Sequence, residues 1–282
     1  MKSPASPPTA SRARPKRPPR AEARPLKKGV AMDETGFLVE RIGAVARCSM
    51  NHPQIMNALN LETGEPMAEA IGRLVADDTV SVIVLRAEGE NFCTGSDLAL
   101  LGDNLDPAFL SRLMSRANAM LLDLYHGPKI VITEVDGYAV GGGLGLALAS
   151  DLTLATERAK FCCGFIRIGA VPDLGTSYFL PERVGTVMAK EIALTGDIID
   201  AERALAIGLI NRVVPHEEIS EAVMTLAGRI AKASPEALAW TKRNLNRAPH
   251  TDLRTLLDIE AHVQPLMLLT EAHKAAVRKL LS

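Results

Sequence analysis

The residues between Val135 and Gly145 have the composition of an anion-binding turn. They run from an apolar segment through Gly141, Gly142 and Gly143 into a stretch of small apolar residues. Consecutive glycines let the backbone approach a ligand closely and adopt positive φ angles. A helix that begins here points unpaired N–H groups and the positive end of its dipole at that ligand. The segment predicts a site for an anion or a developing oxyanion; a tight joint between a strand and a helix is the alternative.

Two further segments offer groups for the same chemistry. Gly95 makes a turn after the strand expected at 80–87, and the N–H of Ser96 is a second candidate donor, so that one donor from each loop would form an oxyanion hole. Asp173 lies within an apolar frame, which desolvates a carboxylate, raises its pKa and makes it a better base. The frame consists of Phe165, Ile166, Ile168, Val171 and Leu174. The alternative is that Asp173 caps the helix that follows it.

The cysteines and histidines indicate no metal site. The four cysteines and the six histidines show no metal-ligand spacing, and no secretory signal precedes the cysteines. No histidine lies close in sequence to Cys162 or Cys163, so nothing nearby would activate either thiol. We therefore expect reduced, mostly buried thiols and a cytoplasmic location.

The elements that must position these residues alternate between strands and helices. Strands are expected at 37–40, 44–48, 80–87, 130–135 and 152–155, from short apolar or alternating runs. Helices are expected between them, at 63–75, 109–125 and 144–150. The last third is helical throughout, at 187–195, 200–207, 217–233, 235–248 and 252–281. This order predicts an α/β fold with a helical C-terminal extension.

Charge is distributed unevenly along the 282 residues, although the formal net charge is only −1. Residues 1–29 hold nine Lys or Arg, one Glu, seven prolines and no aromatic residue, so we expect a disordered tail over 1–31. A mitochondrial transit peptide, a nucleic-acid-binding arm and an upstream extension before Met32 are the alternatives. The prolines oppose the amphipathic helix of a transit peptide, and an arm would lack stacking aromatics. No apolar stretch is long enough to cross a bilayer.

Four motifs stand in order along the chain. They are Phe92-x-x-Gly95-Ser96-Asp97-Leu98, Val135-x-Gly137-x-Ala139-x-Gly141-Gly142-Gly143, Ser150-Asp151-Leu152, and a longer run from Leu194-Thr195-Gly196 to Val213-Val214-Pro215. Together they resemble the enoyl-CoA hydratase/isomerase (crotonase) superfamily over about residues 36–282. The resemblance implies a spiral of ββα units over 32–215, a helical trimerisation region over 216–282, and a CoA thioester as substrate.

The same resemblance assigns roles to residues. It makes the N–H groups of Ser96 and Gly142 the donors to the thioester oxygen. Substrate contacts are implied for Gly95, Asp97, Leu98, Gly141, Gly143, Gly145 and Phe165. The acyl pocket is expected from residues 98–122 and the C-terminal helices. The resemblance also implies a homotrimer or a hexamer of two trimers, and no metal or redox cofactor, because CoA enters as part of the substrate.

Two departures from the family pattern bear on the reaction. Hydratases of the family use two glutamates, and the matching positions here are Gly145 and Phe165. Neither can deprotonate water, so ordinary hydration is not expected. The segment Phe161-x-x-x-Phe165-x-Arg167 to Pro172-Asp173-x-Gly175 resembles instead the ring-epoxide isomerase branch of phenylacetate degradation, whose single carboxylate falls at Asp173. We therefore predict an isomerase that uses Asp173. A hydratase or hydrolase that uses Asp173 with water, and a non-catalytic acyl-CoA-binding member, are the alternatives.

Overall fold

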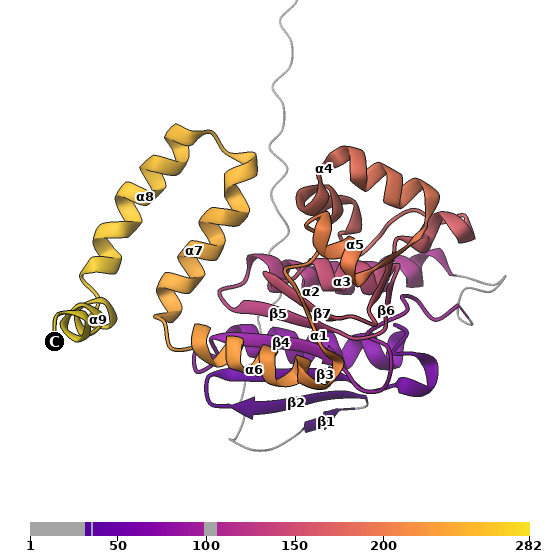
Figure 1. Ribbon diagram of the computed structural model, residues 1–282, viewed down its shortest axis with the longest axis horizontal. Helices are drawn as coiled ribbons and strands as arrows, with labels where there is room; N and C mark the ends of the chain where they lie inside the picture. Colours follow the sequence, from indigo (N-terminus) through magenta and orange to yellow (C-terminus); the bar gives the residue numbers. More distant parts are fainter. Residues whose placement is uncertain (1–31, 35, 99–105) are drawn as a thin grey trace, which may run out of the picture.

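A seven-stranded sheet forms the centre of the computed structural model, which describes residues 32–34, 36–98 and 106–282 (Figure 1). Its strands, in spatial order, are β1 (Met32–Glu34), β2 (Phe37–Ile42), β3 (Val45–Met50), β4 (Val82–Ala87), β5 (Ile130–Val135), β7 (Leu152–Thr156) and β10 (Arg212–Val214). The first three pair antiparallel and the rest are parallel. The predicted tail at 1–31, with its alternatives, lies outside the described residues.

A second, smaller sheet stands beside the ends of β5 and β7. It contains β6 (Tyr138–Val140), β8 (Lys160–Cys162) and β9 (Ile198–Asp200) in that order. The chain leaves β5 for β6 and leaves β7 for β8, with a helix between the two steps. This repeated passage between the two sheets is the spiral of ββα units that was expected. The three strands of this sheet are three residues long, which is too short for a periodicity to reveal them.

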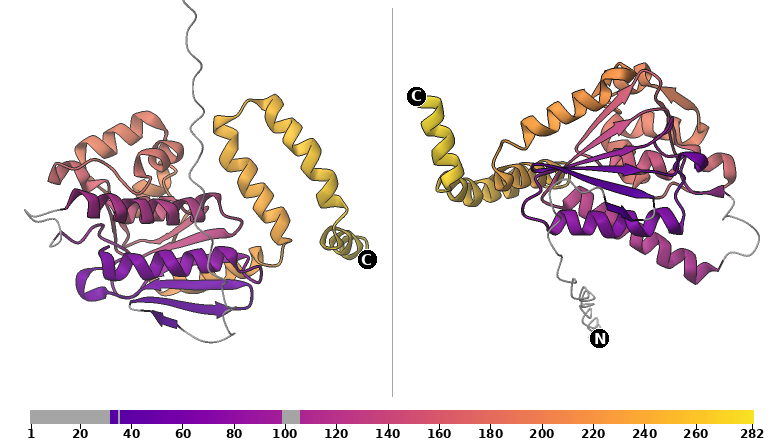
Figure 2. Two further views of the ribbon diagram at one scale, coloured as in Figure 1. Left: turned by 180° about the vertical axis from the view of Figure 1, so that it is seen from behind. Right: turned by 90° about the horizontal axis from the view of Figure 1, so that it is seen from below.

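Helices cover both faces of the large sheet (Figures 1 and 2). On one face lie α1 (Leu61–Ala76), α2 (Pro107–His126) and the short α3 (Gly142–Leu148). On the other lies α6 (Ile219–Ile230), whose Val223 and Leu226 pack on Val82, Val84 and Ile132. Strands buried on both faces are continuously apolar, which explains why β4 and β5 were readily predicted from the sequence.

The C-terminal helices differ from the expectation in two places. α4 (Thr176–Thr195) begins eleven residues before the predicted start, and the non-helical Gly185 (φ 75°) interrupts it, which hid its first half from the periodicity. The helix predicted over 252–281 is in fact two helices, α8 (Leu253–Leu268) and α9 (Glu271–Leu281), because the Thr270 hydroxyl caps a new N-terminus. α5 (Ala201–Ala206) and α7 (Pro235–Arg247) lie close to the predicted spans.

The last helices project from the body of the molecule. α7 and α8 form an antiparallel pair beside the sheets, and α9 lies at its far end (Figures 1 and 2). The Lys242 ammonium attaches α7 to the core, donating to the carbonyl oxygens of Leu124 (2.6 Å) and Lys129 (2.8 Å) and to the Asp151 carboxylate (2.8 Å). No helix of the described residues is long and apolar enough to span a membrane.

Candidate active site

Two glycine turns meet at the N-terminus of α3. Gly141 (φ 55°) precedes the first helical residue, Gly142, and no side chain caps this end. In the other loop Gly95 has φ 87°, and a Cβ atom there would lie 2.9 Å from the Val140 oxygen and 3.3 Å from the Gly142 nitrogen. Only glycine permits that conformation together with that approach. The two loops expected to supply donors are therefore in backbone contact.

Backbone hydrogen bonds hold the Ser96 loop in place. The Leu59 N–H donates to the Gly95 oxygen (2.7 Å), and the Asp97 N–H donates to the Leu59 oxygen (3.0 Å). Between these two bonds, the Ser96 N–H donates to no backbone acceptor in the described part of the chain. The Gly142 N–H is the first of its helix and has no intrahelical partner. Both N–H groups are thus available to an oxygen that approaches this corner.

Asp173 lies near the N-terminus of α3, on the turn between a 3-10 segment (Gly164–Ile168) and α4. One of its oxygens, Oδ1, lies 3.6 Å from the position that a Cβ atom on Gly142 would take. That oxygen is buried and accepts no hydrogen bond from the described residues. The capping alternative is wrong, because the N-cap of α4 is Gly175 and no side chain bonds there. The Asp173 carboxylate therefore does not cap the N-terminus of α4.

Burial raises the pKa of Asp173, and the hydrogen bond from its own N–H only partly opposes this. The next residue, Leu174, has a left-handed backbone (φ 44°), which is uncommon outside glycine. A methyl group of Leu174 lies 2.8 Å from the Cβ position of Gly142, so this side chain covers the space beside the carboxylate. A desolvated carboxylate with an unpartnered oxygen is suited to accept a proton from carbon.

The two positions at which the family pattern has glutamates are occupied differently. A Cβ atom on Gly145 would lie 2.5 Å from the Leu174 oxygen and 2.6 Å from the Thr176 hydroxyl oxygen, so the fold has no room for a side chain there. Phe165 is buried, and its ring lies 3.7 Å from the Cβ position of Gly141. Gly143 packs against the Cys93 oxygen, 2.2 Å from its Cβ position. At Gly143 and Gly145 the absence of a side chain permits close backbone packing.

A partly open cavity of about 60 Å³ is lined by both Asp173 and Ser96. α1 and α2 form most of its wall. Its other lining residues are Leu59, Asn60, Gly64, Glu65, Met67, Leu113, Met114, Arg116, Ala117, Met120 and Leu174. Of the segment 98–122, the α2 residues line this cavity. The α1 residues were not predicted, and no residue of the C-terminal helices lines this cavity. Leu98, expected to contact substrate, is 63% exposed and lies outside this lining.

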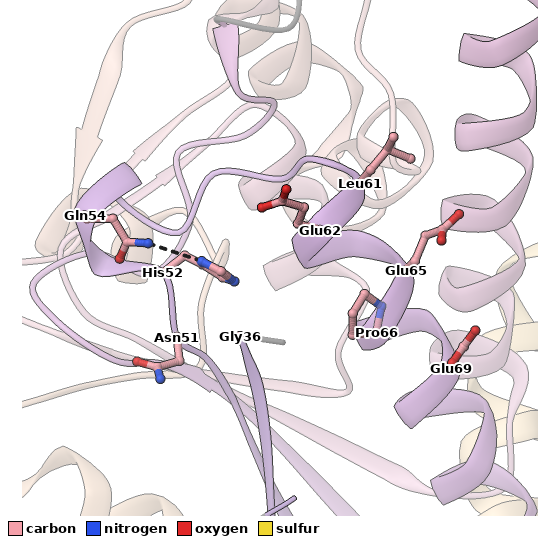
Figure 3. A pocket seen from close by; sticks show the side chains of 9 residues that line it. All are labelled: Gly36, Asn51, His52, Gln54, Leu61, Glu62, Glu65, Pro66 and Glu69. Carbon is pink, nitrogen blue, oxygen red and sulfur yellow. Dashed lines mark hydrogen bonds between the residues drawn. The ribbon is translucent and has the colours of Figure 1, made fainter. Parts of the chain in front are cut away.

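A second hollow, on the other side of α1, has a different character. It measures about 830 Å³ and is lined by Glu62, Glu65 and Glu69 together with His52 (Figure 3). None of Ser96, Gly142 and Asp173 lines it. Its acidic wall distinguishes it from the site at α3.

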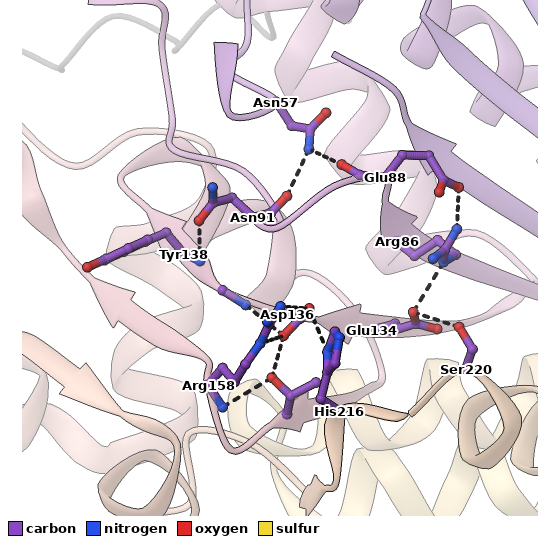
Figure 4. Close-up of polar contacts among 12 residues, drawn as sticks. Asn57, Arg86, Glu88, Asn91, Glu134, Asp136, Tyr138, Arg158, His216 and Ser220 are labelled. Carbon is purple, nitrogen blue, oxygen red and sulfur yellow. Dashed lines mark hydrogen bonds and ion pairs between the residues drawn. The ribbon is translucent and has the colours of Figure 1, made fainter. Parts of the chain in front are cut away.

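Polar side chains that sequence reasoning missed brace the two glycine loops (Figure 4). The Asn57 amide donates to the Glu88 oxygen (2.9 Å) and the Asn91 oxygen (2.8 Å), and the Asn91 side chain accepts from the Tyr138 N–H (3.2 Å). The Asp136 carboxylate, at the end of β5, accepts from Arg158 and Thr156. Each of these contacts joins residues at least 20 positions apart, so a short sequence motif could not have predicted it.

The cysteines are buried, as predicted, and poorly reactive. Burial raises the pKa of Cys93 to about 12 and that of Cys163 to about 11. Asp151 braces neighbouring segments, since its carboxylate accepts hydrogen bonds from the Val131 N–H and from Lys242. Among the titratable residues near the glycine turns, Asp173 is thus the one that combines burial with an oxygen unused by the described structure.

A family model for enoyl-CoA hydratase/isomerase matches residues 40–279 of this chain. The chain belongs to this family. Its curated relatives include a crotonyl-CoA hydratase of Syntrophomonas wolfei, 32% identical over 240 residues, which cover 84% of this chain and 92% of the relative. A 1,2-epoxyphenylacetyl-CoA isomerase of Escherichia coli is 34% identical over 227 residues, covering 79% and 86%. The crotonase resemblance expected from the motifs is thus confirmed.

Solved structures agree on the fold. An enoyl-CoA hydratase/isomerase from Cupriavidus metallidurans superposes with a TM-score of 0.83 at 32% identity, covering 89% of this chain and 94% of the other. The protein DspI of Pseudomonas aeruginosa gives a TM-score of 0.84 at 29% identity, covering 90% and 97%. The crotonase-type spiral is therefore shared over nearly all of the described chain, and acyl-CoA processing is the activity class of this family member.

Proposed function

We propose that this family member is an enoyl-CoA isomerase that moves a double bond between the β,γ and α,β positions of an acyl thioester. The observation that carries the proposal is the Asp173 carboxylate, which is buried with its Oδ1 unpartnered and lies beside the N-terminus of α3. It is a single proton-transfer group facing two free backbone donors. One such group suffices for a reaction in which a proton leaves one carbon and returns to another.

The proposed steps use only groups of this chain. The thioester oxygen accepts hydrogen bonds from the N–H groups of Ser96 and Gly142, which acidifies the α-carbon. Asp173 removes the α-proton, and the electron pair delocalises into a dienolate held by the same two donors. Asp173 then returns the proton to the γ-carbon, which completes the α,β-unsaturated product. No bond to water forms and no electrons are gained or lost, so the reaction requires neither a metal nor a redox cofactor.

Hydration is the nearest alternative, because several relatives are named hydratases, including the one from Syntrophomonas wolfei. Two features argue against it here. The space beside Gly145 is filled by the Leu174 carbonyl and the Thr176 hydroxyl, and Phe165 places a ring where the second family glutamate would stand. Without those carboxylates, Asp173 would have to position water, deprotonate it and protonate carbon alone.

Turnover in heavy-oxygen water, followed by mass spectrometry, tests the proposal. Wild type and Asp173→Asn each receive 3-enoyl-, 2-enoyl- and 3-hydroxyacyl-CoA esters. The expected result is mass-neutral conversion of a 3-enoyl ester by wild type, absent in the variant. Incorporation of heavy oxygen would overturn it in favour of a hydratase or hydrolase. Acyl-CoA binding without any turnover would instead indicate a non-catalytic member.

We also propose that the protein acts as a homotrimer, or as a hexamer of two trimers, assembled through α7–α9. These helices carry exposed leucines that no described residue covers: Leu245, Leu253, Leu257, Leu266, Leu269, Leu280 and Leu281. Apolar patches of this kind mark interaction surfaces. Light scattering during size-exclusion chromatography should give three or six times the 30.2 kDa chain mass. A monomer would contradict the proposal.

A further inference from the structure

The α1 helix contains a glycine whose position has no local explanation. Gly64 lies in the helix interior, where glycine is among the least favourable residues. It stands three residues before Met67 and seven before Ile71, which are 2% and 0% exposed. Residues at this spacing share one helix face, so position 64 lies on the inner face, toward α2. Because position 64 is a glycine, no side chain of α1 fills the space between α1 and α2 at this point.

The space beside Gly64 is open. A Cβ atom built there meets no heavy atom of the described residues within 4 Å, whereas at Gly142, Gly143 and Gly145 it would clash with neighbouring atoms. Gly64 lines the 60 Å³ cavity that also contains Ser96 and Asp173. Across this space, α2 presents Ala117, another small residue. A continuous cavity thus connects the reacting corner with the gap between α1 and α2.

The wall of this gap is aliphatic. Leucine and methionine side chains form most of it, and no aromatic residue of the described chain lines it. Its polar groups already have partners: the Asn60 side chain accepts from the Thr63 N–H (3.0 Å), and Glu65 pairs with Arg116 across the two helices. Methionine adapts its shape to flexible chains.

The described lining of this space favours a flexible chain. Leucine and methionine side chains surround it, and among the described residues no aromatic ring is placed to stack on a ring substituent. The aromatic substrate in the name of the Escherichia coli relative would need a different wall.

We propose that Gly64 is a specificity-determining residue: the distal carbons of an unbranched aliphatic acyl chain lie against it, between α1 and α2. The inference rests on the proposed function for the position of the thioester at Ser96 and Gly142. It goes further in assigning the acyl class and the residue that limits chain length. A side chain at position 64 would occupy the place of the distal methylenes and leave the reacting end untouched.

The test compares two glycines of the same helix. Gly64→Leu fills the open space, and Gly72→Leu is the matched control, because Gly72 is also in α1, also has open space at its Cβ position, and does not line the cavity. Both changes replace glycine in a helix with a better helix former, so both should raise the melting temperature. A loss of binding in the first variant then cannot be attributed to unfolding.

Binding of saturated, non-reacting esters is measured by calorimetry for butanoyl-, octanoyl- and phenylacetyl-CoA. A buried methylene contributes roughly fourfold to affinity. If the leucine displaces about three methylenes, Gly64→Leu should weaken the binding of octanoyl-CoA by roughly 60-fold. The binding of butanoyl-CoA should weaken far less, and Gly72→Leu should bind both esters as the wild type does. Equal weakening of both esters, no weakening, or tighter wild-type binding of phenylacetyl- than of octanoyl-CoA would overturn the inference. Because these esters do not react, this result is independent of whether the isomerase assay succeeds.

Discussion

The two halves of the candidate active site are built in different ways. The half that faces the thioester oxygen consists of backbone N–H groups of Ser96 and Gly142, fixed by glycine turns and by hydrogen bonds from neighbouring loops. The half that would move the proton is one side chain, Asp173, whose Oδ1 no described residue holds. Binding and charge stabilisation thus depend on the fold, and the choice of reaction depends on one substitutable carboxylate.

Removing the side-chain half should have the largest effect. Asp173→Asn keeps the size and polarity of the group but cannot accept the α-proton. General base catalysis contributes typically about 10²–10⁴-fold, so kcat on a 3-enoyl-CoA should fall by that amount. The Kd of a saturated acyl-CoA should stay within about threefold, as measured by calorimetry. More than a tenth of the wild-type kcat in the variant would show that Asp173 is not the base.

The half of the site made of backbone donors can be tested only by a substitution that removes an N–H group. Gly142→Pro does so at the first position of α3, which proline tolerates because that N–H has no helical partner. Loss of one oxyanion donor should lower kcat by about 10²–10³-fold. Gly142→Ala is the control: it adds the same Cβ atom beside Leu174 but retains the donor. Equal kcat values for the two variants would show that the Gly142 N–H is not a donor to the thioester oxygen.

Lowering the pH should distinguish the contributions of the two halves of the site without any mutation. The backbone donors do not titrate, whereas burial raises the pKa of Asp173 and only its ionised form is a base. Below that pKa, kcat/KM should fall about tenfold for each pH unit, with a midpoint above the ordinary aspartate value of about 3.9. The binding of a saturated ester at the same pH values reports on the rest of the site. A midpoint at or below the ordinary value would contradict the burial argument.

The smallest predicted effect is on stability. Because the folded-state pKa of Asp173 is raised, the native protein loses stability as pH rises from the unfolded-state pKa toward the folded-state pKa. At neutral pH, Asp173→Asn should therefore raise the melting temperature by about 2 °C, and the gain should vanish in acid, where the wild-type group is protonated in both states. Scanning calorimetry at two pH values measures this. A lower melting temperature at neutral pH would mean that the charge stabilises the fold.

Much of the fold and part of the site could be predicted from the sequence, for identifiable reasons. β4 and β5 are mostly apolar and rich in valine and isoleucine, and the glycine turns before α3 and at Gly95 are local patterns. The β6–β8–β9 sheet escaped because three-residue strands have no period. The break at Thr270 escaped because apolar spacing continues across it.

The candidate site shows the same division. Asp173 and the two donors lie in short motifs that can be found one at a time. Their bracing by Asn57 and Asn91 joins residues 31 to 47 positions apart, and the open space beside Gly64 exists only once α2 packs on α1. Such contacts arise from tertiary packing between distant segments, so they cannot be predicted from any short stretch of the sequence.

The packing around Gly145 has an evolutionary consequence. The Leu174 carbonyl and the Thr176 hydroxyl occupy the volume that a side chain at position 145 would need. A mutation that introduces a carboxylate there would meet these atoms before it could give any catalytic benefit. Leu174, in turn, is held in its left-handed conformation directly after Asp173. A glutamate at position 145 would fit only after the Asp173 turn had moved, so no single substitution at this position can add a second carboxylate to the site.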